Sequence, residues 1–302
     1  MRIKLSNSVP SLDLARQTPG RSARWGGHEF LINTPTEEAD AWVIMDGLAA
    51  PDRVKCPRSH TLLFAAEPPS FKRYAPRWTK NFARVITVHD APPPLLWLLG
   101  QDYDFLEKDL PAGEKRGLLS AICSRKTTLP GHRRRLAFLE KLHSHLEFDF
   151  FGRGFREIPG KWEGLAPYHY SIAMENSVHP NYWTEKIADC FLTETVPVYF
   201  GCPNIAAFFP SESYILIDPA SPREVAEKLR TTLSPEDYRR RLPALREAKK
   251  LALNHYNLFS VITRLMDRLP STAFPEPIEF SPEPPPPYWR KKLTKIWRRF
   301  PI

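Results

Sequence analysis

The chain of 302 residues is 42% hydrophobic and 25% charged, which is the composition of a soluble globular protein with room for two domains. Its net charge of +9 predicts attraction to anions, and a nucleotide-sugar or an acidic membrane surface is favoured. Outside 288–300, which is treated below, no basic run is interleaved with aromatic residues as in a nucleic-acid module, and no stretch approaches the about 20 apolar residues of a membrane span, so we expect neither nucleic-acid binding nor a transmembrane helix.

Residues 1–115 are predicted to form an α/β domain. They contain three short apolar runs that are typical of buried parallel strands, at 41–45, 61–66 and 84–88. Each run ends at polar or acidic residues, namely Asp46, Glu67 and the pair His89 and Asp90. Sheets of α/β domains place their chemistry just beyond strand ends, although ordinary turns use the same residue types.

Glu67 is the strongest of these candidates. Pro68 and Pro69 follow it directly, and they fix the backbone and remove two donors, which suits a rigid carboxylate at the edge of a cleft. The alternative is that the two prolines only terminate the strand.

A polar break at 111–117 predicts the boundary to a second α/β domain, 116–269. Residues 118–123 read as a strand that ends at Ser124, and 132–143 as a helix that opens with Arg133, Arg134 and Arg135. Three cations at a helix start oppose its dipole at a cost of up to about 1 kcal/mol each, so at least one is expected to have an anionic partner. The segment 155–167, which contains Lys161, is predicted to be a loop.

Residues 168–201 predict a strand, turn, helix and strand, the βαβ module of doubly wound sheets. The helix is expected from about Tyr182 to Leu192, and its start favours a bound anion. Lys186 in the first turn adds a positive charge suited to phosphate, and Glu185 has the chemistry to accept two ribose hydroxyls. The alternative is an ordinary solvated helix start.

The last part, 270–302, differs from the rest in composition. Proline dominates 270–287 and predicts an extended linker without a core of its own. Residues 288–300 carry six Lys or Arg and no acid, with aromatic and aliphatic residues on one helical face. Such a basic amphipathic helix is typical of peripheral attachment to an anionic membrane, at about 1 kcal/mol per cation; the alternative is docking on the protein itself or on a partner.

Three motifs of the central module resemble a known family. Residues 174–177 (MENS), 182–186 (YWTEK) and 195–201 (TVPVYFG) are similar, in order and spacing, to the signature of the α-1,3-fucosyltransferases of glycosyltransferase family 10. The lack of a membrane anchor and of paired cysteines makes the resemblance one to the bacterial type.

The resemblance implies a GT-B glycosyltransferase in which two Rossmann-like domains face a cleft, with acceptor binding in 1–115 and GDP-sugar binding in 116–269. It implies an inverting fucosyltransferase that moves L-fucose from GDP-fucose to a glycan hydroxyl, α-1,3 in type, with no cofactor and no metal. The alternatives are a transferase for another GDP-sugar and a nucleotide-sugar-binding protein without turnover.

Residue roles follow from the same resemblance. Glu67 is implied as the base, although Ala66 and Ala83 stand where the family has glycine and aspartate. Arg135 is implied on the diphosphate, with Arg134 not separable from it by spacing, and Glu185 on the ribose. The full set of implied GDP-sugar-binding residues is Ser124, Arg135, Asn176, Tyr182, Glu185 and Lys186.

The expected location is the cytoplasm, with peripheral contact to the inner face of the cytoplasmic membrane. The four cysteines are scattered and form no Cys-x-x-Cys pair, which favours reduced thiols over a metal cluster, and the first residues contain no apolar core of a signal peptide. A surface glycan such as lipopolysaccharide would suit such an enzyme as acceptor.

Overall fold

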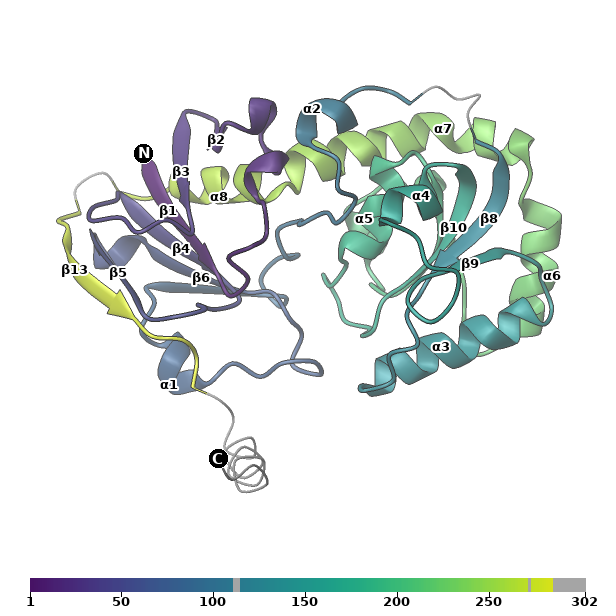
Figure 1. The fold of residues 1–302 in the computed structure, drawn as a ribbon, viewed down its shortest axis with the longest axis horizontal. Coiled ribbons are helices and arrows are strands. Elements are labelled where there is room, and N and C mark those ends of the chain that lie inside the picture. The colour runs from purple at the N-terminus through teal and green to yellow at the C-terminus, as the bar shows by residue number, and fades with distance from the viewer. Residues whose placement is uncertain (111–114, 271–272, 285–302) are drawn as a thin grey trace, which may run out of the picture. The chain divides into compact units, whose positions relative to one another are not determined.

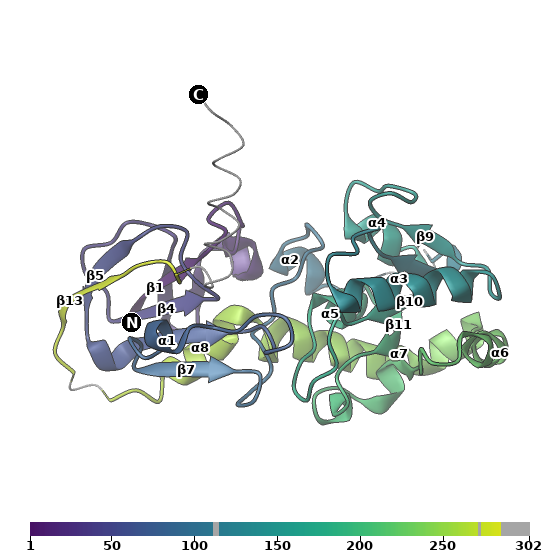
Figure 2. The same ribbon diagram turned by 90° about the horizontal axis from the view of Figure 1, so that it is seen from below.

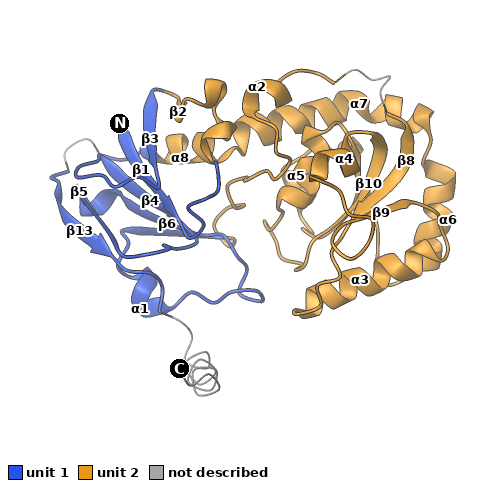
Figure 3. Cartoon of the chain, viewed as in Figure 1, with its two compact units in different colours: residues 1–13, 27–87, 266–302 blue, residues 14–26, 88–265 orange. Residues whose placement is uncertain are grey.

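The computed structural model describes residues 1–110, 115–270 and 273–284. The chain forms two compact units (Figure 3). The first unit comprises Met1–Asp13, Gly27–Thr87 and the described residues from Met266 to 284, and the second comprises Leu14–Gly26 and the described part of Val88–Leu265.

A parallel sheet forms the centre of the first unit (Figure 1). Neighbouring strands pair in parallel in the order β3 (His28–Ile32), β1 (Arg2–Asn7), β4 (Ala41–Met45), β6 (Thr61–Ala65) and β7 (Arg84–Thr87). The apolar runs that predicted strands are β4, β6 and β7. Strands β4 and β6 are buried along their whole length, as central parallel strands are. A short helix, α1 (Pro76–Thr79), lies between β6 and β7.

The first unit also contains a two-stranded sheet, in which β5 (Asp52–Cys56) pairs antiparallel with β13 (Glu276–Phe280). The expectation of a linker without a core is wrong for this part of 270–287. The ring of Phe280 packs 4.8 Å from that of Trp42 and 4.5 Å from that of Phe82, between centroids, and Ile278 is buried beside them. Apolar burial therefore outweighs the proline content. The predicted amphipathic tail, 288–300, lies outside the described residues.

The second unit is built on a parallel sheet in the order β12 (Ile215–Leu216), β11 (Val196–Phe200), β10 (Tyr168–Met174), β8 (Gly117–Ile122) and β9 (Asp149–Phe151). Figure 2 shows its helices beside the strands. They are α2 (Tyr103–Leu106), α3 (Pro130–His143), α4 (Lys161–Leu165), α5 (Glu185–Leu192), α6 (Pro222–Thr232) and α7 (Pro235–Lys250). The short strand β2 (Arg24–Trp25) also lies in this unit, and α8 (Leu258–Met266) runs to its end.

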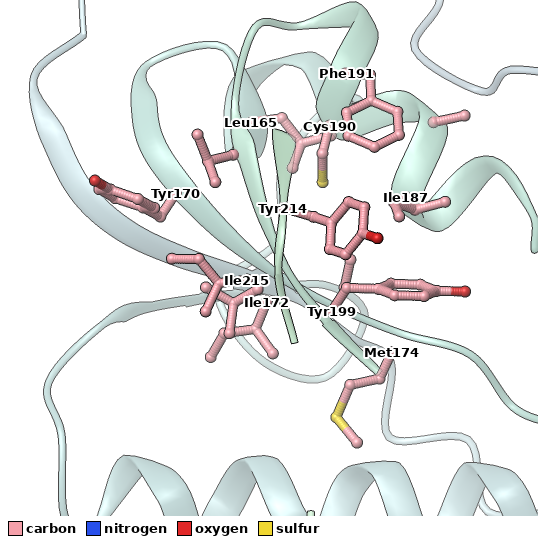
Figure 4. Packing of buried hydrophobic residues seen from close by; sticks show 14 of the residues in the cluster. Leu165, Tyr170, Ile172, Met174, Ile187, Cys190, Phe191, Tyr199, Tyr214 and Ile215 are labelled. Carbon is pink, nitrogen blue, oxygen red and sulfur yellow. The ribbon is translucent and has the colours of Figure 1, made fainter. Parts of the chain in front are cut away.

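The core of the second unit lies between the sheet and helices α5 and α7. Figure 4 shows Ile187 and Phe191 of α5 near Tyr199 of β11, with Ile172 of β10 close by. Apolar residues recur along α5 with helical spacing and form one face of the helix. This face packs α5 against β10 and β11.

The division into units differs from the expected boundary near residue 115. Leu95, Trp97 and Leu106 are buried in the core of the second unit, so residues 88–110 pack with it. The composition break at 111–117 therefore does not coincide with the boundary between the units, and residues 111–114 lie outside the described residues. None of the described helices has the length and apolar character needed to cross a membrane.

Candidate functional site

A cavity of about 530 Å³ lies in the second unit, beyond the carboxyl ends of β8 and β10. This is the position at which doubly wound sheets bind their ligands. Five of the predicted donor-site residues line it, namely Ser124, Arg135, Asn176, Glu185 and Lys186. Side chains from the ends of two strands and the starts of two helices thus share one cavity.

Helix α5 begins at Glu185, three residues later than expected, and Thr184 caps it by accepting from the Lys186 N–H at 3.3 Å. The side chain of Glu175 occupies the helix start. Its carboxylate accepts from the Thr184 N–H at 2.9 Å and from the Thr184 hydroxyl at 3.0 and 2.9 Å. The anion that we expected at this helix start is therefore supplied in part by the protein itself.

Lys186 is held between two carboxylates. Its Nζ lies 3.3 Å from Glu175 Oε2 and 3.4 Å from Glu185 Oε1, and it donates to Thr184 Oγ1 at 3.0 Å. Burial opposes the charged form of Lys186, but the two carboxylates raise its pKa above the ordinary value. Lys186 is consequently a fixed cation at the cavity wall.

Two buried polar atoms on the wall have no hydrogen-bond partner among the described residues: Arg135 Nε and Asn176 Oδ1. An unpartnered buried donor or acceptor costs about 1–3 kcal/mol, and the cost is removed when a ligand supplies the missing partner. Arg135 lines the cavity whereas Arg134 is exposed, which separates the two arginines that sequence spacing left equivalent.

Gly131, in the first turn of α3, sets how closely that helix approaches the strand end of β10. A Cβ built on Gly131 would lie 1.9 Å from the backbone oxygen of Asn176. The glycine therefore permits the contact that brings Arg135 and Asn176 to the same cavity.

We expect Gly131→Ala to destabilise the protein by about 1–3 kcal/mol, the range found for overpacked sites, and to weaken nucleotide binding, because α3 must move away from Asn176. Urea unfolding and nucleotide titration measure the two effects. For stability, Gly160→Ala is the matched control, since its nearest neighbour would be the Glu163 carboxylate at 3.3 Å, the end of a flexible side chain. Equal losses of stability in the two variants would contradict the role of Gly131.

Lys161 and Asp189 also line the cavity, and the sequence did not single them out as site residues. Residues 161–165 form helix α4 rather than the predicted loop. Lys161 Nζ lies 2.8 Å from Asp189 Oδ2 and 3.5 Å from Glu185 Oε1. Asp189 Oδ1 in turn accepts from the Leu98 N–H at 3.2 Å. Glu185 and Asp189 are four residues apart on α5, and this spacing of two acids was the available sequence signal.

The charge of Glu185 is stabilised by two lysines. Burial by itself would raise the pKa of Glu185, but Lys186 and Lys161 lower it to about 2 from its ordinary 4.5. Since the folded-state pKa lies below the unfolded one, this carboxylate stabilises the fold above about pH 4.5, and the contribution is lost as the pH falls towards about 2.

Lys161→Met should lower the free energy of unfolding by about 3 kcal/mol near neutral pH, because it leaves the buried Asp189 carboxylate without its cation. With one cation fewer, the pKa of Glu185 rises towards its ordinary value, so the stability lost below about pH 4.5 is smaller than in the parent protein and is fully lost at a higher pH. Urea unfolding between about pH 6 and pH 2 measures both effects. Lys141→Met, at an exposed position of α3, is the control. A loss of stability between about pH 4.5 and pH 2 as large as in the parent protein would refute the coupling.

Two predicted site residues do not line this cavity. Tyr182 is buried in the turn before α5, where its N–H donates to the His179 carbonyl at 3.2 Å. Glu67 is half-buried after β6 in the first unit. Among the described residues, no group of three or more His, Cys, Asp or Glu side chains is arranged to hold a metal ion.

Residues 113–243 match the family model described as glycosyltransferase family 10 (fucosyltransferase) C-term. The chain is 35% identical over 101 residues to 4-galactosyl-N-acetylglucosaminide 3-α-L-fucosyltransferase FUT6 of Pongo pygmaeus, covering 32% of this chain and 28% of that protein. It is 34% identical over 101 residues to 3-galactosyl-N-acetylglucosaminide 4-α-L-fucosyltransferase FUT3 of Homo sapiens, with the same two shares. The alignment thus spans 28% of the length of these relatives.

A solved α-glucosyltransferase in complex with UDP and a 13-mer DNA superposes with a TM-score of 0.57 at 10% identity, over 89% of this chain and 100% of that one. At this identity the likeness concerns the fold. The predicted fold, α/β with two Rossmann-like domains of the GT-B type, is confirmed. The family match falls within the second unit, so it does not extend to Glu67.

Proposed function

We propose that the chain is an enzyme that transfers L-fucose from GDP-fucose to a hydroxyl of a glycan, because residues 113–243 match the model of glycosyltransferase family 10, the fucosyltransferase family. The observation that supports the donor site most directly is the convergence of five predicted residues on one cavity of about 530 Å³. That volume lies within the range of pockets that bind small molecules and cofactors.

The cavity supplies the chemistry that a nucleoside diphosphate needs. Arg135 brings a buried, unpartnered Nε and a planar fork suited to two phosphate oxygens, and Lys186 brings a fixed cation. Glu185 remains ionised and accepts hydroxyls of the ribose. Asn176 Oδ1 accepts a donor of the ligand.

The reaction in this proposal is a single displacement. The acceptor oxygen forms a bond to the anomeric carbon of fucose while the bond from that carbon to the β-phosphate oxygen breaks, which inverts the configuration. Glu67 takes the proton of the acceptor hydroxyl, and GDP leaves with the electron pair of the broken bond. Arg135 and Lys186 stabilise the charge that develops on the diphosphate, and no metal is assigned to this step.

Calorimetric titration with GDP, GDP-fucose, GDP-mannose and UDP tests the donor site. Binding of both GDP and GDP-fucose with no binding of UDP is expected. Binding of GDP-mannose with turnover would assign a different sugar, and binding without release of GDP to any glycan acceptor would leave a nucleotide-sugar-binding protein. Failure to bind either GDP or GDP-fucose would refute the proposal.

The acceptor and the location belong to the same proposal. A surface glycan such as lipopolysaccharide, α-1,3 fucosylated, is the proposed product class, and the basic residues of 288–300 are proposed to hold the enzyme on the anionic inner face of the cytoplasmic membrane. Cosedimentation with phosphatidylglycerol vesicles, and its absence with phosphatidylcholine vesicles, is the expected result. Equal binding to both kinds of vesicle would contradict electrostatic attachment through these residues.

A further inference from the structure

The segment that carries Glu67 is fixed by side chains from a neighbouring strand end. Asp46 follows β4, and its Oδ1 accepts from the Ala66 N–H at 3.0 Å. The Tyr74 hydroxyl donates to the same Asp46 oxygen in a short hydrogen bond and accepts from the Glu67 N–H at 3.3 Å. Burial, together with the charge of Asp46, raises the pKa of Tyr74 well above its ordinary value, so Tyr74 keeps the proton that it donates.

Lys72 connects this cluster to a distant part of the chain. Its Nζ donates to the backbone oxygen of Asp46 at 2.8 Å and lies 4.2 Å from the centroid of the Tyr74 ring. The same ammonium forms an ion pair with Glu283 Oε2 at 3.3 Å. Lys72 therefore contacts both Asp46, which holds the Glu67 segment, and Glu283, which follows β13.

Residues 281–283 contact the segment after Glu67 at two further points. Glu283 Oε1 accepts from the Ala75 N–H at 2.6 Å, and the Ser281 carbonyl accepts from Trp78 Nε1 at 2.8 Å. Only 16% of the Glu283 side chain is exposed. Figure 1 shows the chain running from β13 past α1, which contains Trp78. The burial of Ile278 and Phe280 anchors this run on the first unit.

We propose that Glu283 is a positioning residue for Glu67: it holds Lys72 and the Ala75 N–H, and through Asp46 and Tyr74 it fixes the backbone that carries the proposed base. The role of Glu67 in this inference rests on the proposed function. The contacts of Glu283 with Lys72 and with the Ala75 N–H, here called the brace, lie within the first unit. Pro68 and Pro69 restrict the backbone beside Glu67 but leave residues 70–75 to be ordered by other contacts. Both Glu283 oxygens engage that stretch, one through an ion pair and one through a backbone hydrogen bond.

Two substitutions of Glu283 remove its interactions with Lys72 and with the Ala75 N–H in two steps. Glu283→Gln keeps an oxygen that can accept from the Ala75 N–H but loses the charge that pairs with Lys72, whereas Glu283→Ala loses both. Glu276→Ala is the matched control, because Glu276 lies on β13 and pairs with Arg58 at 2.6 Å on an exposed face. All three variants are taken through urea unfolding, so that rates are compared at conditions where each is folded.

Turnover is followed as GDP released from GDP-fucose, with water or a supplied glycan as acceptor. A misplacement of about 1 Å can cost about 100-fold in rate, so we expect the turnover number of Glu283→Ala to fall by about 10- to 100-fold, with Glu283→Gln between it and the parent. The affinity for GDP should stay within about twofold of the parent value. Hydrogen exchange at the Glu67 and Ala75 amides should be faster in Glu283→Ala and unchanged in Glu276→Ala.

A parent-like turnover number in Glu283→Ala, or the same loss in Glu276→Ala, would overturn the positioning role. Parent-like exchange at both amides would overturn the brace itself. If the parent protein neither binds GDP-fucose nor releases GDP, the proposed function fails, and the exchange comparison still decides whether Glu283 holds the Glu67 segment.

Discussion

Replacing Glu67 by Gln is expected to lower fucose transfer by about 100- to 10,000-fold, the usual contribution of a general base, while GDP still binds with parent affinity. The amide keeps the size of the carboxylate but cannot take the proton of the acceptor hydroxyl. The proposed donor site lies in the second unit and Glu67 in the first, so the substitution leaves every cavity residue in place. Single-turnover release of GDP from GDP-fucose, beside GDP titration, measures the two quantities.

Glu37→Gln is the control for a charge removed from the first unit, since Glu37 is exposed. It should transfer at the parent rate. Transfer by Glu67→Gln at the parent rate would remove Glu67 as the base and direct attention to Asp46, the neighbouring strand-end acid.

Replacing Arg135 by Ala should weaken GDP binding by about 10- to 150-fold, whereas Arg134→Ala should leave it unchanged. The prediction rests on the adjacent positions of the two arginines on α3: Arg135 lines the cavity and Arg134 is exposed. Hydrogen bonds to charged groups contribute about 1.5–3 kcal/mol, and each 1.4 kcal/mol corresponds to a tenfold change in affinity. Titration with GDP and with GMP shows whether the loss concerns the second phosphate.

Arg135→Lys refines the test, because lysine keeps the charge but lacks the planar fork. Its affinity for GDP should lie between those of the parent and of Arg135→Ala. Equal weakening by Arg134→Ala would mean that the arginines act only through the general positive charge of the helix start, and the assignment of Arg135 to the diphosphate would fall.

The central module could be predicted because its chemistry is contiguous in sequence. Asn176, Glu185 and Lys186 lie within residues 174–186, and the strand and helix that carry them follow from apolar periodicity. The start of α5 was placed too early, because the turn residues resemble a first helical turn. Asn181 has a φ of 64°, outside the helical region, and Thr184 is the residue that caps the helix.

The pairing of Lys161 with Asp189 and the brace at Glu283 could not be predicted in this way. Each joins residues from separate elements, and only the folded topology brings them together. Proline content also misled the interpretation of 276–280. Pro277 lacks a donor, but an edge strand that pairs on one side tolerates this, and the buried Ile278 and Phe280 decide the outcome.

The pairing of β5 with β13 has a consequence for synthesis of the chain. Strand β5 is made early, but its antiparallel partner follows only after all of residues 88–265. At about 5–20 residues per second, the nascent first unit waits about 10–40 s with Val54 and Cys56 uncovered. An unpaired strand edge is a template for association with other chains. We therefore expect mutations that slow completion of the first unit to lower the yield of the protein before they lower the stability of the finished protein.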